Sequence, residues 1–261
     1  MENNIVAYKN ELNTLPLRNF NSVEIDFLCT ILSTMRNKGT DQLTFDFSEL
    51  RELSKYKPTA NSRFANDLEK TYDKLISLNI KIGDDSRWTK FVLFTEYTVD
   101  LDNEEITIGT NPKFAPLIND LENNFTKFEL EEMVSLKSSY SKNAYRLLKQ
   151  FRSTGFYKVT IDDFRELMDI PKSYQMFNVR QTVFEPILTE LPTYFKNLEI
   201  KEIKGIGKKK RSTVALEFTF TPQKDIHKDE KGKSFVIERE NNDYKTTYAE
   251  EMTAEQVDKY F

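Results

Sequence analysis

One stretch near residue 180 combines an apolar helical stripe with a face of hydrogen-bonding side chains. The apolar stripe recurs at helical spacing through Val179, Val183, Phe184, Ile187, Leu188 and Leu191. The opposite face carries Asn178, Gln181, Thr182, Glu185 and Thr189. Asn and Gln pair well with adenine in the major groove of DNA, and Glu accepts from cytosine. Taken alone, the pattern favours an ordinary solvated face. Inside a helix-turn-helix followed by a basic hairpin, it favours base reading.

Two residues do not fit a regular helix over 178–191. Arg180 falls within the apolar stripe, so its stem must lie along that surface or the residue must sit at the start of the helix. We include it among the candidate DNA contacts. Pro186 removes one backbone hydrogen bond and crowds the carbonyl of Thr182, a cost of about 3 kcal/mol in a helix interior. The sequence therefore predicts a kink.

The clearest electrostatic signal lies in the predicted hairpin 205–213. It is a run of four cations, Lys208, Lys209, Lys210 and Arg211. On a wing, such a run would contact phosphates or enter the minor groove. The alternative is a charged hairpin that only keeps the protein soluble.

Two further helices carry candidate phosphate contacts. The helix predicted over 62–78 directs Arg63, Asn66 and Lys70 outward, a set that suits either phosphate contact or a partner surface. A helix from Ser138 to about Ser153 places Lys142, Arg146 and Lys149 at i, i+4 and i+7. This basic stripe would touch the DNA backbone between two major-groove sites. A simply solvated helix explains it equally well.

The elements that position these residues occur twice along the chain. Phe47–Leu53 is echoed by Ile161–Leu167, and each copy precedes a turn containing Lys and Pro. Each is then followed by a longer amphipathic helix and a strand pair. Helix, turn, helix and β-hairpin is the layout of a winged helix-turn-helix. We therefore predict an α+β fold with two tandem winged helix-turn-helix domains that hold a long stretch of duplex DNA.

The predicted domain plan has four parts. Residues 1–136 form an N-terminal winged-helix domain, and 137–155 form a connecting basic helix. Residues 156–222 form the C-terminal winged-helix domain. Residues 223–261 are charged and read as a largely disordered tail, with a short helix near 254–260.

Net charge is −4, but the distribution matters more than the sum. Residues 156–222 carry 11 basic and 9 acidic side chains, a net of +2, whereas 223–261 carry 7 and 10, a net of −3. Salt screening makes local charge dominate, so basic patches suffice for phosphate contact. The lone Cys29 in an apolar pattern fits a buried thiol in a reducing cytoplasm. Neither an 18-residue apolar run nor a signal-peptide pattern is present, so we expect a soluble cytoplasmic protein that does not enter membranes.

The residue types argue against catalysis. His227 is the only histidine, which excludes a paired-histidine metal site and, with one cysteine, a zinc site. A phosphate-binding Gly-rich loop ending in Lys-Ser/Thr is absent. We expect no catalytic residues, no metal and no cofactor. A nuclease that uses only Asp, Glu and Lys stays open, because carboxylates are abundant.

Several segments resemble one known family. They are Phe125–Leu130, Ser138–Lys142, Tyr145–Phe151, Phe156–Val159, Ile170–Tyr174, Val183–Ile187, Tyr194–Leu198 and Leu216–Phe220. Across residues 5–222 the chain resembles the iteron-binding, theta-type plasmid replication initiators of low-GC Gram-positive bacteria. The tail shares no pattern with them.

The resemblance implies two winged-helix domains that bind directly repeated origin sites (iterons) in double-stranded plasmid DNA. It assigns dimerisation and DNA contact to residues 1–136 and makes 156–222 the main DNA reader. It implies partners as well: a second copy, as a dimer or in tandem on the repeats, and the host replication initiator and helicase. By position, Asn178, Gln181, Thr182 and Glu185 would read bases. Lys172, Ser173 and Tyr174 would support the turn or touch phosphate. Lys208–Arg211 would hold the backbone.

We therefore predict an initiator that opens an origin with host factors. The runner-up is a tandem winged-helix transcriptional repressor without initiator activity, since both functions need the same grip on DNA. Repeats of about 20 base pairs beside an AT-rich stretch favour the initiator. One palindrome at a promoter favours the repressor.

Overall fold

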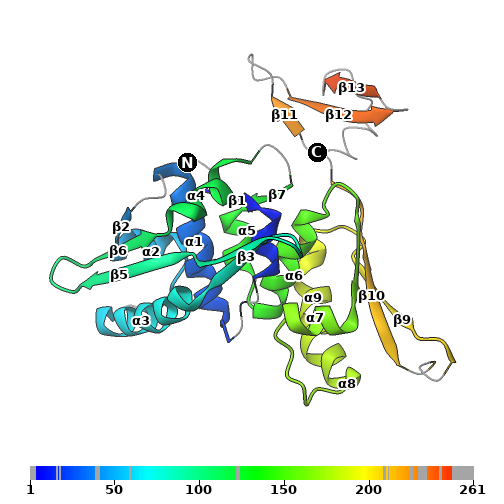
Figure 1. Cartoon of the computed structure of the whole chain (residues 1–261), viewed down its shortest axis with the longest axis horizontal. Coiled ribbons are helices and arrows are strands. Elements are labelled where there is room, and N and C mark those ends of the chain that lie inside the picture. The colour runs from blue at the N-terminus through cyan, green and yellow to red at the C-terminus, as the bar shows by residue number, and fades with distance from the viewer. Residues whose placement is uncertain are drawn as a thin grey trace.

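The computed structural model describes residues 4–15, 17, 19–38, 42–58, 60–121, 124–207, 210, 212–223, 226–228, 234–240 and 243–248. Two units with the same order of elements follow one another along the chain and lie side by side (Figure 1). Each unit contains a helix, a strand, two further helices and a β-hairpin. The predicted α+β fold with tandem winged helices is confirmed.

The first unit builds a three-stranded antiparallel sheet in the order β2-β6-β5. Its elements are α1 (Ser22–Lys38), β2 (Gln42–Asp46), α2 (Phe47–Leu53), α3 (Asn61–Ser77), β5 (Phe94–Asp100) and β6 (Glu105–Thr110). In β2 the apolar residues alternate, so Leu43 and Phe45 are buried while their neighbours are exposed.

The second unit repeats this arrangement with a sheet in the order β8-β10-β9. Its elements are α6 (Ser139–Gln150), β8 (Phe156–Thr160), α7 (Ile161–Leu167), α8 (Met176–Val179), a π-helical segment (Arg180–Phe184), α9 (Glu185–Glu190), β9 (Glu199–Lys204) and β10 (Thr213–Thr219). The two echoed sequence segments are α2 and α7, which hold the same place in their units.

Local sequence signals explain where the helices of the second unit begin and end. The Ser138 hydroxyl accepts from the backbone N–H of Tyr140 and Ser141 at the start of α6. The Thr160 hydroxyl accepts from the Asp163 N–H at the start of α7. Gly155 follows α6 with φ of 64°, and a Cβ there would lie 2.4 Å from the Phe220 carbonyl oxygen.

The first unit carries elements that the sequence patterns did not reveal. Near the start of the chain, β1 (Ile5–Lys9) pairs with β7 (Phe125–Glu129). Between α3 and β6 there are three strands: β4 (Trp88–Val92) pairs with β3 (Asn79–Gly83), and β5 pairs with β6. The break between β4 and β5 falls at Leu93, whose backbone N–H donates to Leu78 and whose side chain is buried.

Short elements complete this unit. They are the 3₁₀ turns Asn10–Thr14 and Pro112–Phe114, α4 (Ala115–Asn119) and α5 (Leu130–Ser135).

Helix α6 packs into both units. It lies against α1 and β7 of the first unit and α9 of the second. The Tyr145 ring makes edge contacts with Phe128 on one side and with Tyr194 and Phe195 on the other. By order of elements, α6 has the place in the second unit that α1 has in the first. The segment 137–155 is thus part of the packed core of the molecule and more than the connection that we predicted.

Three segments of 223–261, a region predicted to be largely disordered, form strands. Three strands, β11 (Ile226–Lys228), β12 (Ser234–Glu240) and β13 (Asp243–Tyr248), pair in an antiparallel sheet with β12 in the centre (Figure 1). Charge and low hydrophobicity suggested disorder, but β-branched and aromatic residues in Phe235–Ile237 and Tyr244–Tyr248 suit paired strands. The helix predicted near 254–260 lies outside the described residues.

Candidate DNA interface

The helical stretch from α8 through the π-helical segment to α9 presents the polar face that the sequence predicted. Val179, Val183, Ile187 and Leu191 are buried in the core of the second unit. The side chains on the other side are all exposed: Asn178, Gln181, Thr182, Glu185 and Thr189. Leu188, which we placed in the apolar stripe, is 40% exposed.

Pro186 is accommodated by a change of helix type. Arg180–Phe184 is π-helical, and the Glu185 backbone N–H donates to the Arg180 carbonyl five residues earlier. Pro186 then lies in the first turn of α9, where a missing N–H is tolerated. The predicted disturbance is therefore a widened turn. π-Bulges are frequent at functional sites.

The start of the helix is held by a reciprocal cap. The Gln175 side chain accepts from the Asn178 backbone N–H, and the Asn178 Oδ1 accepts from the Gln175 N–H at 3.0 Å. Asn178 is thereby oriented by its own helix. Its Nδ2 is not part of this cap, so the amide retains a donor for a base edge.

Arg180 joins this helix to the wing. Its Nε lies 2.5 Å from Glu202 Oε1, and its Nη2 lies 2.9 Å from Glu202 Oε2. Glu202 on β9 also accepts from Lys204 Nζ at 2.7 Å and Thr213 Oγ1 at 2.6 Å. The Arg180 hydrogen bonds, helped by those from Lys204 and Thr213, lower the pKa of Glu202 to about 2.

This pair corrects the sequence-based placement of Arg180. Arg180 is exposed, so it does not lie in the apolar stripe. It is the first residue of the π-helical segment, which follows α8, so it does not lie at the helix start either. Its guanidinium is engaged by a carboxylate on the wing. Arg180 therefore links the helix to the wing through this ion pair.

The turn before α8 holds Lys172, Ser173 and Tyr174. Lys172 and Ser173 are exposed, and Tyr174 is half-buried. Arg165 Nη2 on α7 donates to the Tyr174 carbonyl oxygen at 3.0 Å, which ties the turn to the preceding helix.

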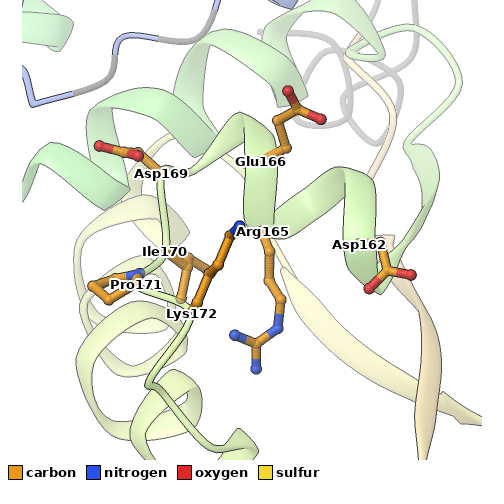
Figure 2. A pocket seen from close by; sticks show the side chains of 7 residues that line it. All are labelled: Asp162, Arg165, Glu166, Asp169, Ile170, Pro171 and Lys172. Carbon is orange, nitrogen blue, oxygen red and sulfur yellow. The ribbon is translucent and has the colours of Figure 1, made fainter.

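A shallow pocket lies between α7 and this turn. Arg165 and Lys172 project into it (Figure 2). Its lining consists of Asp162, Arg165, Glu166, Asp169, Ile170, Pro171 and Lys172. The mixed charge makes it a poor site for a free anion.

The wing of the second unit consists of β9, β10 and the hairpin between them. Lys210 is exposed at its tip, and its backbone N–H donates to the Gly207 carbonyl at 3.1 Å. Lys208, Lys209 and Arg211 lie outside the described residues.

The candidate phosphate contacts of the first unit are also exposed. Arg63, Asn66 and Lys70 lie on the outer face of α3. Arg63 and Lys70 line one surface hollow together with the start of α1, whereas Asn66 does not. Arg63 Nε is 3.9 Å from Asp67 Oδ2, one turn further along the helix.

The prediction that a basic stripe on α6 contacts DNA is wrong. Lys142, Arg146 and Lys149 are 0%, 4% and 9% exposed, so DNA cannot reach them. Lys142 Nζ donates to Asp26 on α1 and, at 2.9 Å, to the Met133 carbonyl. We withdraw these three residues as DNA contacts. The helical spacing was right, but α6 is covered on both sides.

The other two cations of α6 are also partnered. Arg146 Nη1 donates to the Leu12 carbonyl at 3.3 Å. Lys149 Nζ lies 2.9 Å from Glu132 Oε2 and over the rings of Tyr145 and Phe195.

Burial raises the pKa of Asp26 to about 6, even though Lys142 pulls it down. Removing this carboxylate from water thus outweighs the attraction of its partner.

Sequence reasoning missed two residues of this region. Glu202, which orients Arg180, gave no signal, because a single Glu in a strand is unremarkable. Phe177 is 62% exposed beside Asn178. Phe177 lies outside the apolar stripe and four residues before Gln181, so the sequence alone could have placed it on the polar face.

Among the residues that the structure describes, no group of three or more His, Cys, Asp or Glu side chains could hold a metal ion. Of the helices in the described part of the chain, none has the length and apolar character needed to cross a membrane.

Two family models match the chain, one in each unit. A model described as Initiator Replication protein, WH1, matches residues 5–149. A model described as Initiator Rep protein, WH2, matches residues 160–220.

Individual proteins agree with these matches. A protein of Bifidobacterium longum (strain NCC 2705) described as "Probable replication protein rep" is 38% identical over 193 residues, 73% of this chain and 65% of its own length. This chain thus spans about two thirds of that relative. The crystal structure of Pi initiator protein in complex with iteron DNA aligns with a TM-score of 0.65 at 15% identity, covering 86% of this chain and 100% of the other. At that identity the likeness shows the fold alone.

Proposed function

The chain belongs to the family of initiator replication proteins with two winged-helix parts, and from this membership we propose that it initiates plasmid replication by binding direct repeats in duplex DNA. One observation carries the proposal. The polar face of α8–α9 is exposed, and the Arg180–Glu202 ion pair links this helical stretch to the wing. That geometry suits a helix in the major groove and a hairpin on the adjacent backbone.

The class of ligand is carried over from a protein of the same fold. The Pi initiator was crystallised with iteron DNA. We propose the same class of ligand here, with Asn178, Gln181, Thr182 and Glu185 at base edges. Lys172, Ser173 and the wing residues Lys208–Arg211 hold phosphates. Arg63, Asn66 and Lys70 supply a second contact from α3.

Repeated sites let several copies bind in phase along one duplex. We propose that these contacts strain an adjacent AT-rich segment until it opens, and that the host initiator and helicase then enter. A second copy would bind either in tandem on the repeats or as a dimer that limits copy number. In this scheme the energy comes from protein–DNA contacts, and no nucleotide is hydrolysed. The site of action is the bacterial cytoplasm.

Footprinting over the DNA that flanks the coding sequence tests the proposal, combined with permanganate reactivity for unpaired thymines. We expect protection of tandem direct repeats and reactive thymines in a neighbouring AT-rich stretch. Protection of one promoter palindrome, without unpaired thymines, would identify a repressor. Strand cleavage with Mg²⁺ that a single carboxylate substitution abolishes would identify a nuclease.

Two variants separate base reading from phosphate contact. We expect Gln181→Ala to weaken binding to the repeat and leave binding to scrambled DNA unchanged, because only a base edge is lost. Alanine at all of Lys208–Arg211 should weaken binding to both DNAs about equally. Gel shifts across a range of salt measure this. Lys113→Ala, an exposed lysine of the first unit outside the proposed interface, is the control. Equal losses on both DNAs from both variants would contradict this division of roles.

A further inference from the structure

Phe177 is an apolar ring in the middle of a polar surface. It is the second residue of α8, and 62% of it is exposed. Its neighbour Asn178 is exposed as well, and so is Gln181, four residues further on and on the same side of the helix. Met176 and Val179, which flank Phe177 and Asn178 in the sequence, provide the contacts with the core. The ring of Phe177 is thus not needed to hold the helix in place.

An exposed phenylalanine has a specific use on a surface that enters the major groove. Thymine alone among the four bases presents a methyl group there, and apolar side chains contact it. Adenine, on the opposite strand of the same base pair, presents the donor and acceptor that Asn and Gln pair with. Phe177 beside Asn178 and Gln181 therefore combines complementary groups for A·T pairs.

Resting on the proposed function, we propose that the Phe177 ring reads thymine in the repeat by packing against its 5-methyl group. It is a specificity-determining contact that acts together with Asn178 and Gln181. Because Phe177 lies on the same exposed face as these polar residues, DNA is favoured over a second copy of the chain as the partner that the ring contacts.

Deoxyuracil tests the proposal, because it differs from thymine only by the missing methyl group. The probe is the footprinted repeat, prepared with thymine throughout, with deoxyuracil throughout, and with single replacements at each thymine. For the unaltered protein we expect one or two single replacements to weaken binding about fourfold each, the loss that corresponds to one methyl-sized group. In Phe177→Ala the same replacements should have no effect.

Two further variants sharpen the test. Phe177→Leu retains an apolar contact and should retain the sensitivity to deoxyuracil at the same positions. Phe156→Ala truncates another exposed phenylalanine, 45% exposed on β8, and should leave binding to both probes unchanged.

The outcomes separate the two proposals. If the unaltered protein binds the repeat but tolerates every deoxyuracil, the thymine contact is wrong and the initiator function stands. If Phe177→Ala loses affinity equally for both probes, the ring acts by packing and the proposal is also wrong. An altered oligomeric state of Phe177→Ala without DNA would assign the ring to contact between copies. Failure to bind any repeat would overturn the proposed function itself.

Discussion

At the scale of single residues, the surroundings decide what a cation does. Lys142 and Lys210 are the same chemical group. Lys210 lies exposed on the wing, whereas Lys142 is fully buried against Asp26 and the Met133 carbonyl. A buried ion pair loses more when one partner is removed than an exposed pair does, because the remaining charge is left without water or a counter-charge. The same buried group that cannot reach DNA thereby becomes important for stability.

Lys142→Met tests this role. The variant retains the side-chain length and leaves the Asp26 carboxylate without its cation, so we expect a loss of about 3–5 kcal/mol in the free energy of unfolding at pH 8. The pKa of Asp26, already raised to about 6, rises further when Lys142 is gone. A group with a raised pKa in the folded state loses stability as the pH rises through that pKa. The gap between the variant and the unaltered protein should therefore shrink as the pH falls from 8 towards 6.

Urea unfolding at pH 5 and pH 8 measures both effects. Lys55→Met is the matched control, because Lys55 pairs with Glu131 at 3.2 Å with both side chains largely exposed. We expect the control to cost less than about 1 kcal/mol at either pH. A loss from Lys142→Met as small as that, or one that is independent of pH, would refute the role given to the buried pair.

At the scale of elements, the stretch α8–α9 shows how a helix accommodates a proline in its interior. A proline within an α-helix would break it, but the π-helical segment Arg180–Phe184 places Pro186 in the first turn of α9. The extra residue in that wide turn also sets the rotation of Asn178 and Gln181 relative to Glu185 and Thr189. We therefore expect the alignment of the polar face to depend on the proline.

We expect Pro186→Ala to leave the free energy of unfolding within about 1 kcal/mol, because the proline already lies where its missing N–H is tolerated. Binding to the repeat should weaken relative to scrambled DNA, because an alanine allows the stretch to return to regular α-helix and rotates the polar face. Competition gel shifts give the ratio of the two affinities. Pro192→Ala, in the 3₁₀ turn Leu191–Thr193 beyond the polar face, is the control. An unchanged affinity ratio for Pro186→Ala would show that the wide turn does not set base preference.

At the scale of the whole molecule, side-chain contacts connect the two units. Asn13 Nδ2 donates to Thr126 Oγ1 at 2.7 Å and to Gln150 Oε1 of α6 at 3.0 Å. Glu190 at the end of α9 accepts from the Lys137 backbone N–H at 2.7 Å, just before α6. These contacts join the first unit, α6 and the second unit. In the proposed function, α3 and the α8–α9 stretch meet one duplex, and these contacts would hold the two units in a fixed relation on it.

A protein that neutralises about 6–10 phosphates should lose affinity steeply with salt, with a slope of log K against log [salt] of about −5 to −9. Fluorescence anisotropy on the repeat between low and physiological salt measures this slope. Lys210→Ala should reduce its magnitude by about 1, because one phosphate contact is lost. Lys142→Met, which alters a buried cation, should leave the slope unchanged. A slope near −2 for the unaltered protein would mean that only one unit meets the DNA.

The sequence by itself determined which segments form the two winged helices and which side of the α8–α9 stretch is apolar. Phe47–Leu53 and Ile161–Leu167 could be predicted as helices because the spacing of their apolar residues is a local property. Only the tertiary structure decided the fate of the α6 cations and of Arg180. Periodicity shows the spacing of side chains on one helix, but exposure depends on what packs against it. In α6 both sides are covered, since α1 and β7 lie on one side and α9 on the other.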